Sequence, residues 1–297
     1  MHRNSAIGVL LLATFLLASA PKSEACQVCV PFPGESLADR ILAAEHLVLA
    51  RENPDQPFTL QAIRTIRQGD PVPPPLELFL DSSTRRQLSL DEDLSILCEW
   101  SPGTGKWRRL ALNSRSLAPV VEAILQNREA WEVDPAARVD YFAGYLAHEA
   151  SVLSDLARIE VYRAPYDQLI RYADRIPREV LLERLANPRL MEWHGLDILF
   201  LARTGIPEDQ ELIREKVEND ARWPVASQRT AWAIALIEID GMAGIERISQ
   251  LYLNGPDRSP EDIAAIREAF RIHAEHGRPE LRDPIANAIR PLEVGMR

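Results

Sequence analysis

The sequence predicts two structural parts: a small β-barrel or sandwich over residues 26–116, followed by an all-α helical array over residues 117–297. The first part contains short strand-like segments separated by turn residues, a pattern typical of small barrels and sandwiches. The second part contains apolar stripes at helical spacing, interrupted by proline and glycine. The 297 residues are enough for two such parts, because one domain takes about 100–200 residues.

Residues 1–25 are expected to be a secretory signal peptide that is not part of the fold. Arg3 supplies a positive start, Ala6–Ala18 an apolar run and Ser23–Ala25 a small-x-small cleavage pattern. The apolar run is short for a membrane span. We therefore expect an exported protein, periplasmic or extracellular, with no membrane span. Cleavage would leave Cys26 first, so a lipid anchor on Cys26 is an alternative, although lipoprotein signals usually carry leucine where Ser23 stands.

The overall charge argues against nucleic-acid binding. The net charge is −10 and the pI is about 5.2, whereas nucleic-acid-binding proteins normally present a basic face. Most of the negative charge falls in residues 117–297. This acidity favours solubility and identifies no ligand.

The first part begins with a short helical segment and continues in strands. Residues 58–67 alternate apolar and polar side chains, as a half-buried strand does, and residues 70–75 (DPVPPP) form a stiff connector. Residues 101–106 predict a hairpin tip; their Gly-Thr-Gly-Lys run lacks the spacing and the following helix of a phosphate loop. The remaining expected elements are a helix over 36–47 passing into an extended stretch over 48–51, and strands over 76–80, 94–100 and 107–112.

The only cysteines are Cys26, Cys29 and Cys98. In an exported protein the default is a disulfide, so we expect Cys98 to pair with Cys26 or Cys29. Redox chemistry at the C-x-x-C motif and zinc binding are alternatives, but the proline-rich sequence after Cys29 is no thioredoxin helix start and no fourth zinc ligand is evident.

Residues 26–112 resemble a netrin-type OB module, the fold of tissue inhibitors of metalloproteinases. The points of contact are Cys26 as the first mature residue, Cys29 soon after it, and the sequences AEHLVLAR (44–51) and AIRTIRQGDP (62–71). In those inhibitors the amino-terminal cysteine chelates the protease zinc, so the resemblance implies that role for Cys26. This chain has C-x-x-C in place of C-x-C and fewer cysteines, so the resemblance mainly implies an OB-like fold.

The second part is expected to be helical throughout. Asp134-Pro135 has the form of an N-cap followed by an N1 proline, and it opens a helical pair reaching residue 169. On this pair Tyr141 and Tyr145 are expected to pack at a helix seam, and Arg158 is expected, with Asp155 and Arg163, to be solvated. The other expected helices cover 119–131, 165–174, 177–186, 189–203, a segment starting at 207, 228–239, a segment through 245–251 and one starting at 260.

Three features refine this helical part. Residues 228–239 are nearly all apolar and should be central, Gly205 should cap a helix, and Ser259 should cap the helix that starts at Pro260. Apolar helices near positions 141, 196 and 231 resemble HEAT-like repeats of exported bacterial proteins, but they are unevenly spaced. The resemblance implies an irregular α-solenoid.

No catalytic constellation or cofactor-binding motif is recognisable. His148-Glu149 lacks the second histidine of a zinc-protease helix, and no G-x-S-x-G motif is present. His273 and His276, with Glu275 between them, lie one turn apart and are the weak metal candidates, although His273 follows an apolar stripe and His276 suits a helix C-terminus. We therefore predict a non-enzymatic scaffold that binds another protein. The alternatives are a protease inhibitor acting through Cys26, or an enzyme with an unrecognised site.

Overall fold

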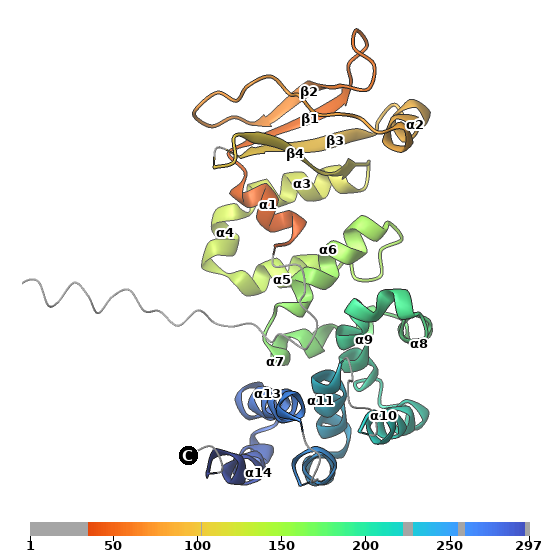
Figure 1. The fold of residues 1–297 in the computed structure, drawn as a ribbon, viewed down its shortest axis with the longest axis vertical. Coiled ribbons are helices and arrows are strands. Elements are labelled where there is room, and N and C mark those ends of the chain that lie inside the picture. The colour runs from red at the N-terminus through yellow and green to blue at the C-terminus, as the bar shows by residue number, and fades with distance from the viewer. Residues whose placement is uncertain (1–34, 102, 222–227, 255–258, 295–297) are drawn as a thin grey trace, which may run out of the picture.

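The structure is a computed structural model that describes residues 35–101, 103–221, 228–254 and 259–294, with side chains described as far as residue 290. Figure 1 shows an elongated molecule with a β-sheet at one end and layers of helices stacked away from it. The C-terminal helices α13 and α14 form the opposite end. The proposed signal peptide, Cys26 and Cys29 lie outside the described residues.

The sheet has four antiparallel strands in the order β2-β1-β3-β4. Their bounds are β1 His46–Glu52, β2 Leu60–Arg67, β3 Ser95–Ser101 and β4 Lys106–Asn113. The strands expected over 58–67, 94–100 and 107–112 are therefore confirmed, and the β3–β4 hairpin turns at the expected tip. The sheet is open, with β2 and β4 at its edges, so the described strands do not form the closed barrel that was expected.

Residues 76–80 do not form the expected strand. Only one isolated bridge, between Thr59 and Phe79, links this segment to the start of β2. The chain then forms a helix that was not expected from the sequence, α2 (Ser82–Leu90), whose N-cap Asp81 accepts a hydrogen bond from the Thr84 backbone N–H at 2.9 Å.

Each face of the sheet has its own core, because side chains alternate between the two faces of a strand. On one face Leu47 and Leu97 pack in the large core formed with the helices beneath the sheet. On the other face Val48 and Cys98 belong to a smaller cluster, which is closed by Leu80 and by Leu88 of α2.

The helix α1 (Leu37–Ala43) joins the sheet to the helical part. Its buried Ala38 and Ile41 belong to the same core as Leu117 and Val120 of α3 (Leu117–Gln126). Figure 1 shows α1 and α3 together beneath the sheet. The hydrophobic core is therefore continuous across residues 116–117.

The rest of the helical part is an irregular stack. The remaining α-helices are α4 Arg128–Val133, α5 Pro135–Ala143, α6 Ser151–Tyr162, α7 Tyr166–Leu169, α8 Arg178–Leu185, α9 His194–Leu201, α10 Pro207–Asp220, α11 Arg229–Asp240, α12 Met242–Ile248, α13 Pro260–His276 and α14 Arg282–Val294. Short 3-10 and π segments (170–175, 188–193, 249–253 and 279–281) join some of them. Every residue of α9 from Gly195 to Leu201 is buried, and α11 is the other central helix, as its apolar sequence predicts.

Three of the predicted helix boundaries are confirmed, whereas the helix expected over 36–47 ends at Ala43 and the helix expected over 119–131 is divided into α3 and α4. The Asp134 side chain accepts hydrogen bonds from the backbone N–H groups of Ala136 and Ala137, at 3.1 and 3.2 Å. Ser259 and Asp262 form a reciprocal capping box at the start of α13. Gly205 has a φ of +70°, a left-handed conformation that favours glycine after α9. Among the described residues, no helix combines the length and the apolar character that crossing a membrane requires.

Candidate protein-binding groove

The two metal candidates contact different parts of the protein. His273 is fully buried, and its Nε2 lies 3.0 Å from the Ile234 carbonyl oxygen. Its Nδ1 is packed closely against Gly277, because a Cβ added to that glycine would lie only 2.7 Å from it. Burial lowers the pKa of His273 and so favours the neutral ring. His276 is partly exposed, with its Nδ1 3.3 Å from an Asp167 carboxylate oxygen. No cluster of three or more metal-binding side chains exists within the described ranges.

Cys98 is buried beneath α2, with a free thiol in the described part of the chain. Burial raises the pKa of this thiol to about 12, although Arg109 partly opposes the increase. Such a thiol is a poor nucleophile near neutral pH, because the thiolate is the reactive form. Because Cys26 and Cys29 are outside the described residues, the disulfide remains a prediction.

The tyrosines of α5 and the loop after it pack as expected. Tyr141 contacts the rings of Trp131 and Phe142, with centroids 5.4 and 5.2 Å apart. The hydroxyl oxygens of Tyr141 and Tyr145 lie 3.2 Å apart, and His148 continues the aromatic cluster. This cluster fastens α5 to α4 and to the following loop.

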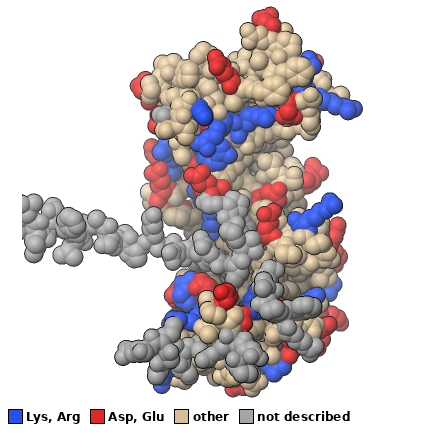
Figure 2. All heavy atoms as spheres, viewed as in Figure 1, with Lys and Arg blue, Asp and Glu red and all other residues tan. Residues whose placement is uncertain are grey.

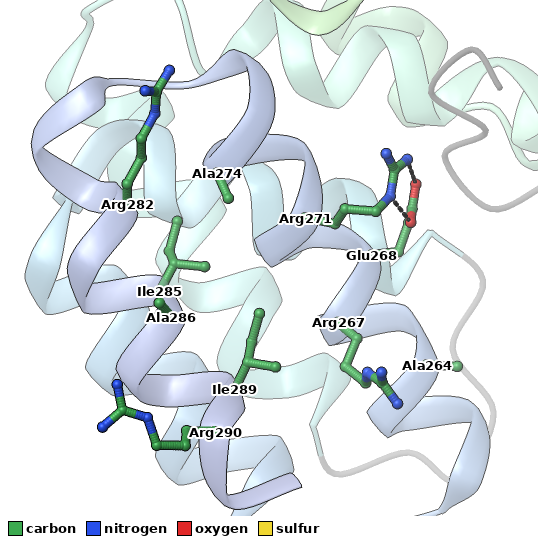
Figure 3. Close-up of a pocket in the computed structure, with 10 residues that line it drawn as sticks. All are labelled: Ala264, Arg267, Glu268, Arg271, Ala274, Arg282, Ile285, Ala286, Ile289 and Arg290. Atoms are coloured by element: carbon green, nitrogen blue, oxygen red, sulfur yellow. Dashed lines mark hydrogen bonds and ion pairs between the residues drawn. The ribbon is translucent and has the colours of Figure 1, made fainter. Parts of the chain in front are cut away.

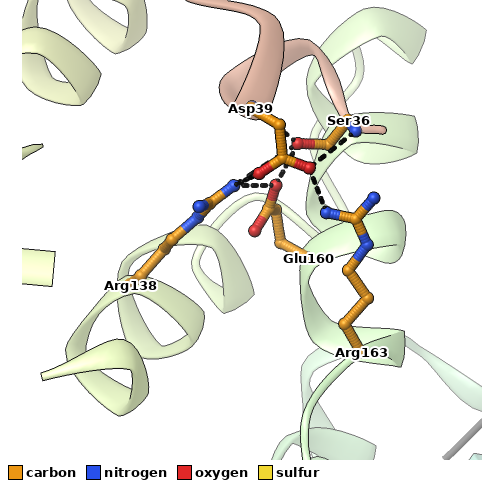
Figure 4. A network of polar contacts seen from close by, with 5 residues as sticks. All are labelled: Ser36, Asp39, Arg138, Glu160 and Arg163. Carbon is orange, nitrogen blue, oxygen red and sulfur yellow. Dashed lines mark hydrogen bonds and ion pairs between the residues drawn. The ribbon is translucent and has the colours of Figure 1, made fainter. Parts of the chain in front are cut away.

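A polar network fastens α1 to α5 and α6 (Figure 4). Arg138 donates to Asp39 at 2.6 Å and to Glu160 at 2.7 Å, while Arg163 donates to the other Asp39 oxygen. The Ser36 hydroxyl donates to Glu160, and Ser36 also caps α1 in a capping box with Asp39. Sequence reasoning missed this network because its members are separated by about a hundred residues.

The charges of this network stabilise one another. Burial alone would raise the pKa of Asp39, but the Ser36 backbone N–H and the guanidinium groups of Arg163 and Arg138 lower it to about 2. Burial alone would lower the pKa of Arg138, but Glu160 and Asp39 raise it. Because these groups bind one another, the network serves to join the elements and is not available as a ligand site.

A second ionic cluster lies deeper, and it corrects the expectation that Arg158 is solvated. Arg158 is 2 % exposed and donates to Asp197 Oδ1 at 2.8 Å, and Arg184 donates to Asp197 Oδ2 at 3.0 Å. The Asp197 side chain is fully buried on α9. Burial also raises the pKa of the neighbouring Asp155, partly offset by Arg158 and Arg184. The cluster ties α6 and α8 to α9.

A groove between α13 and α14 is the best candidate for a binding surface (Figure 3). It encloses about 710 Å³ and has an apolar floor that includes Ile285 and Ile289 of α14 and Ala264 and Ala274 of α13. Ile285 is 1 % exposed and anchors α14 to the main core, whereas Ile289 is only partly buried. The groove is thus open to solvent above a fixed floor.

Arginines line both sides of this groove. Arg267 and Arg271 belong to α13, and Arg282 and Arg290 to α14. Among the lining side chains that the structure describes, Glu268 is the one acidic residue. Arg271 binds Glu268 at 2.7 Å and Glu275 at 2.6 Å, which fixes its orientation. Arg282 and Arg290 are exposed and form no ion pair with any described residue. The groove therefore combines an apolar floor with a positive rim in a protein of net charge −10.

Figure 2 shows side chains of both charges on the face that it displays, with basic side chains gathered below the sheet and acidic side chains around them. Surfaces that carry both signs of charge are typical of solvated protein surfaces.

The groove has a signal in the sequence, because each of its two helices carries its groove residues at regular helical spacing. Its α14 residues recur at the spacing of one helical face, at positions 282, 285, 286, 289 and 290. Its α13 residues do the same at positions 264, 267, 268, 271 and 274. Each helix therefore has one half-exposed face with arginines beside small or aliphatic residues. The pairing of the two faces requires knowledge of the tertiary fold.

No known protein family, curated protein or solved structure matches this chain.

Proposed function

We propose that this chain is an exported, non-enzymatic scaffold that binds another protein in the groove between α13 and α14. The observation that carries the proposal is the partly exposed apolar floor at Ile289, flanked by Arg282 and Arg290. Protein interfaces are enriched in arginine and combine an apolar centre with a polar rim. Arg282 and Arg290 form no ion pair with another described residue, so a ligand would not have to break such a pair to bind them.

The architecture supports a scaffold. The ionic clusters around Asp39 and Asp197 fasten successive layers, so the groove rests on a continuous core rather than on a loop. Rigid presentation lowers the entropy that binding costs. The OB-like and HEAT-like assignments belong to this proposal. The stacked helices support the HEAT-like assignment in outline, whereas the open sheet has the antiparallel pairing of an OB fold without its closed barrel.

Site-specific photo-cross-linking tests the proposal. A photoreactive residue in place of Ala286 lies in the groove. One in place of the adjacent Asn287, which is also exposed, lies in a separate groove on the α12 side of α14. We expect a defined protein adduct in cells of the source organism from position 286 and not from position 287. Equal adducts from both positions, or none from position 286, would refute the proposed binding surface.

A further inference from the structure

We infer that the groove binds an acidic amphipathic helix, so that the partner presents an apolar stripe flanked by carboxylates. This inference rests on the proposed function and specifies the chemistry of the partner. It follows from the shape of the groove, the charges on its rim and their spacing.

The shape favours a helix. The walls are two helices, and the floor residues Ile285 and Ile289 are spaced by four residues, the spacing at which an apolar stripe on a second helix packs. An amphipathic helix in a groove between helices is a recurrent mode of peptide recognition. The partly buried Ile289 is the part of the floor that gains most from being covered.

The rim selects the charge of that helix. Arg282 and Arg290 are eight residues apart on α14, which places their backbones about 12 Å apart along the helix axis. Acidic residues about two turns apart on a helix lying along α14 would meet both guanidinium groups. Arg267 adds a positive charge to the opposite wall of the groove.

The overall charge favours a short acidic segment over a large polyanion. A nucleic acid or an anionic membrane would extend beyond the groove and meet other surfaces of a chain whose overall net charge is −10. A helix of a few turns needs only the groove. The charge balance therefore favours a helix from another protein.

Peptide binding to the full exported chain tests this inference. The probes are two fluorescent peptides of about 18 residues, or five helical turns. Both have the same Leu/Ala stripe, flanked on both sides by Glu in one and by Lys in the other. Fluorescence anisotropy should show binding of the Glu peptide, weaker binding at higher ionic strength, and no binding of the Lys peptide. Equal binding of the two peptides would overturn the inference.

Variants locate the site. Arg282→Glu with Arg290→Glu should weaken binding of the Glu peptide roughly tenfold or more, because it replaces attraction by repulsion on the rim. The control with the same charge change is Arg86→Glu with Lys106→Glu, two exposed residues of the α2 and β4 region, and it should bind as the wild type does. Equal weakening by both pairs would show an effect of net charge alone and would overturn the inference.

A third variant tests the groove without altering charge. Ala286→Trp adds bulk at an exposed groove position and should abolish peptide binding while the circular dichroism spectrum is retained. Unchanged binding would place the peptide elsewhere. Stronger binding of anionic vesicles or single-stranded DNA than of the Glu peptide would identify a membrane or nucleic-acid surface and would overturn the inference. Self-association that Ala286→Trp abolishes would identify a second copy of the chain as the occupant and would also overturn it.

The two proposals fail in different ways. A protein adduct at position 286 together with no preference for the Glu peptide leaves the proposed function intact and refutes the acidic helix. The absence of an adduct at position 286 refutes the proposed function whatever the peptides show.

Discussion

Replacing Asp197 by Asn should strongly destabilise the fold, because Asp197 is the only carboxylate that binds both Arg158 and Arg184 among the described contacts. The side chains of Asp197 and Arg158 are 0 % and 2 % exposed, so water cannot replace the lost charge. The variant keeps the shape of the side chain but leaves two neighbouring guanidinium groups beside a neutral amide. Removing one partner of a buried ion pair costs about 3–5 kcal/mol, a large fraction of the 5–15 kcal/mol that stabilises a typical protein.

The measurement is the free energy of unfolding in urea, followed by far-ultraviolet circular dichroism. The matched control is Glu132→Gln, which breaks the exposed pair between Arg128 and Glu132; their side chains are 51 % and 67 % exposed. That change should cost less than about 1 kcal/mol. Adding Arg158→Met to Asp197→Asn should recover part of the loss, because it removes the stranded buried charge. If Asp197→Asn costs no more than Glu132→Gln, the buried cluster does not have the energetic role assigned to it.

Three further predictions concern other parts of the molecule. The pKa of Asp39 is lowered from 3.8 to about 2, so the carboxylate contributes about 2 kcal/mol of stability that is present above pH 4 and is lost as the pH falls through 2. In urea titrations, the difference in unfolding free energy between the wild type and Asp39→Asn should therefore shrink as the pH is lowered from 4 to 2. Cys98 should resist iodoacetamide in the folded protein, as intact mass would show, because burial raises the pKa of the free thiol to about 12 and a disulfide would not react at all. Labelling in urea without a reductant would contradict the predicted disulfide. Gly244→Ala should lower the free energy of unfolding by about 1–3 kcal/mol despite the better helix propensity of alanine, because the new Cβ would lie 2.6 Å from the Leu236 carbonyl oxygen. Gly103→Ala should have little effect, because its new Cβ would meet only the Ser101 hydroxyl, at an ordinary contact distance of 3.9 Å.

Much of the local structure could be predicted from the sequence. Helix starts at Asp134 and Ser259 depend on neighbouring side chains, and the alternation in residues 58–67 depends on one strand, so both signals are local. The predictions that failed depend on distant residues. Arg158 is buried because Asp197, 39 residues later, neutralises it. Residues 76–80 do not form a strand because a single bridge, between Phe79 and Thr59, is all that pairs this segment with the residues next to β2.

The candidate site was beyond sequence reasoning for the same reason. Arg282, Ile285 and Ile289 form one helical face that can be read from the sequence, but nothing local shows that α13 lies opposite. The two weak metal candidates show that residues close in sequence can have different surroundings in the fold. His273 and His276 are one turn apart, yet one is in the core against Ile234 and the other is near Asp167. Sequence spacing alone could not show which partners the tertiary fold supplies.

The contacts of α1 have a consequence for synthesis. Ser36 and Asp39 precede their partners Glu160 and Arg163 by 124 residues. A chain that grows from its N-terminus therefore produces the complete sheet before the helices that hold α1 exist. Until residue 163 has emerged, the apolar face of α1 and the lower face of the sheet lack their final covering. This interval is when the nascent chain is most exposed to aggregation, and a chaperone would protect it best there.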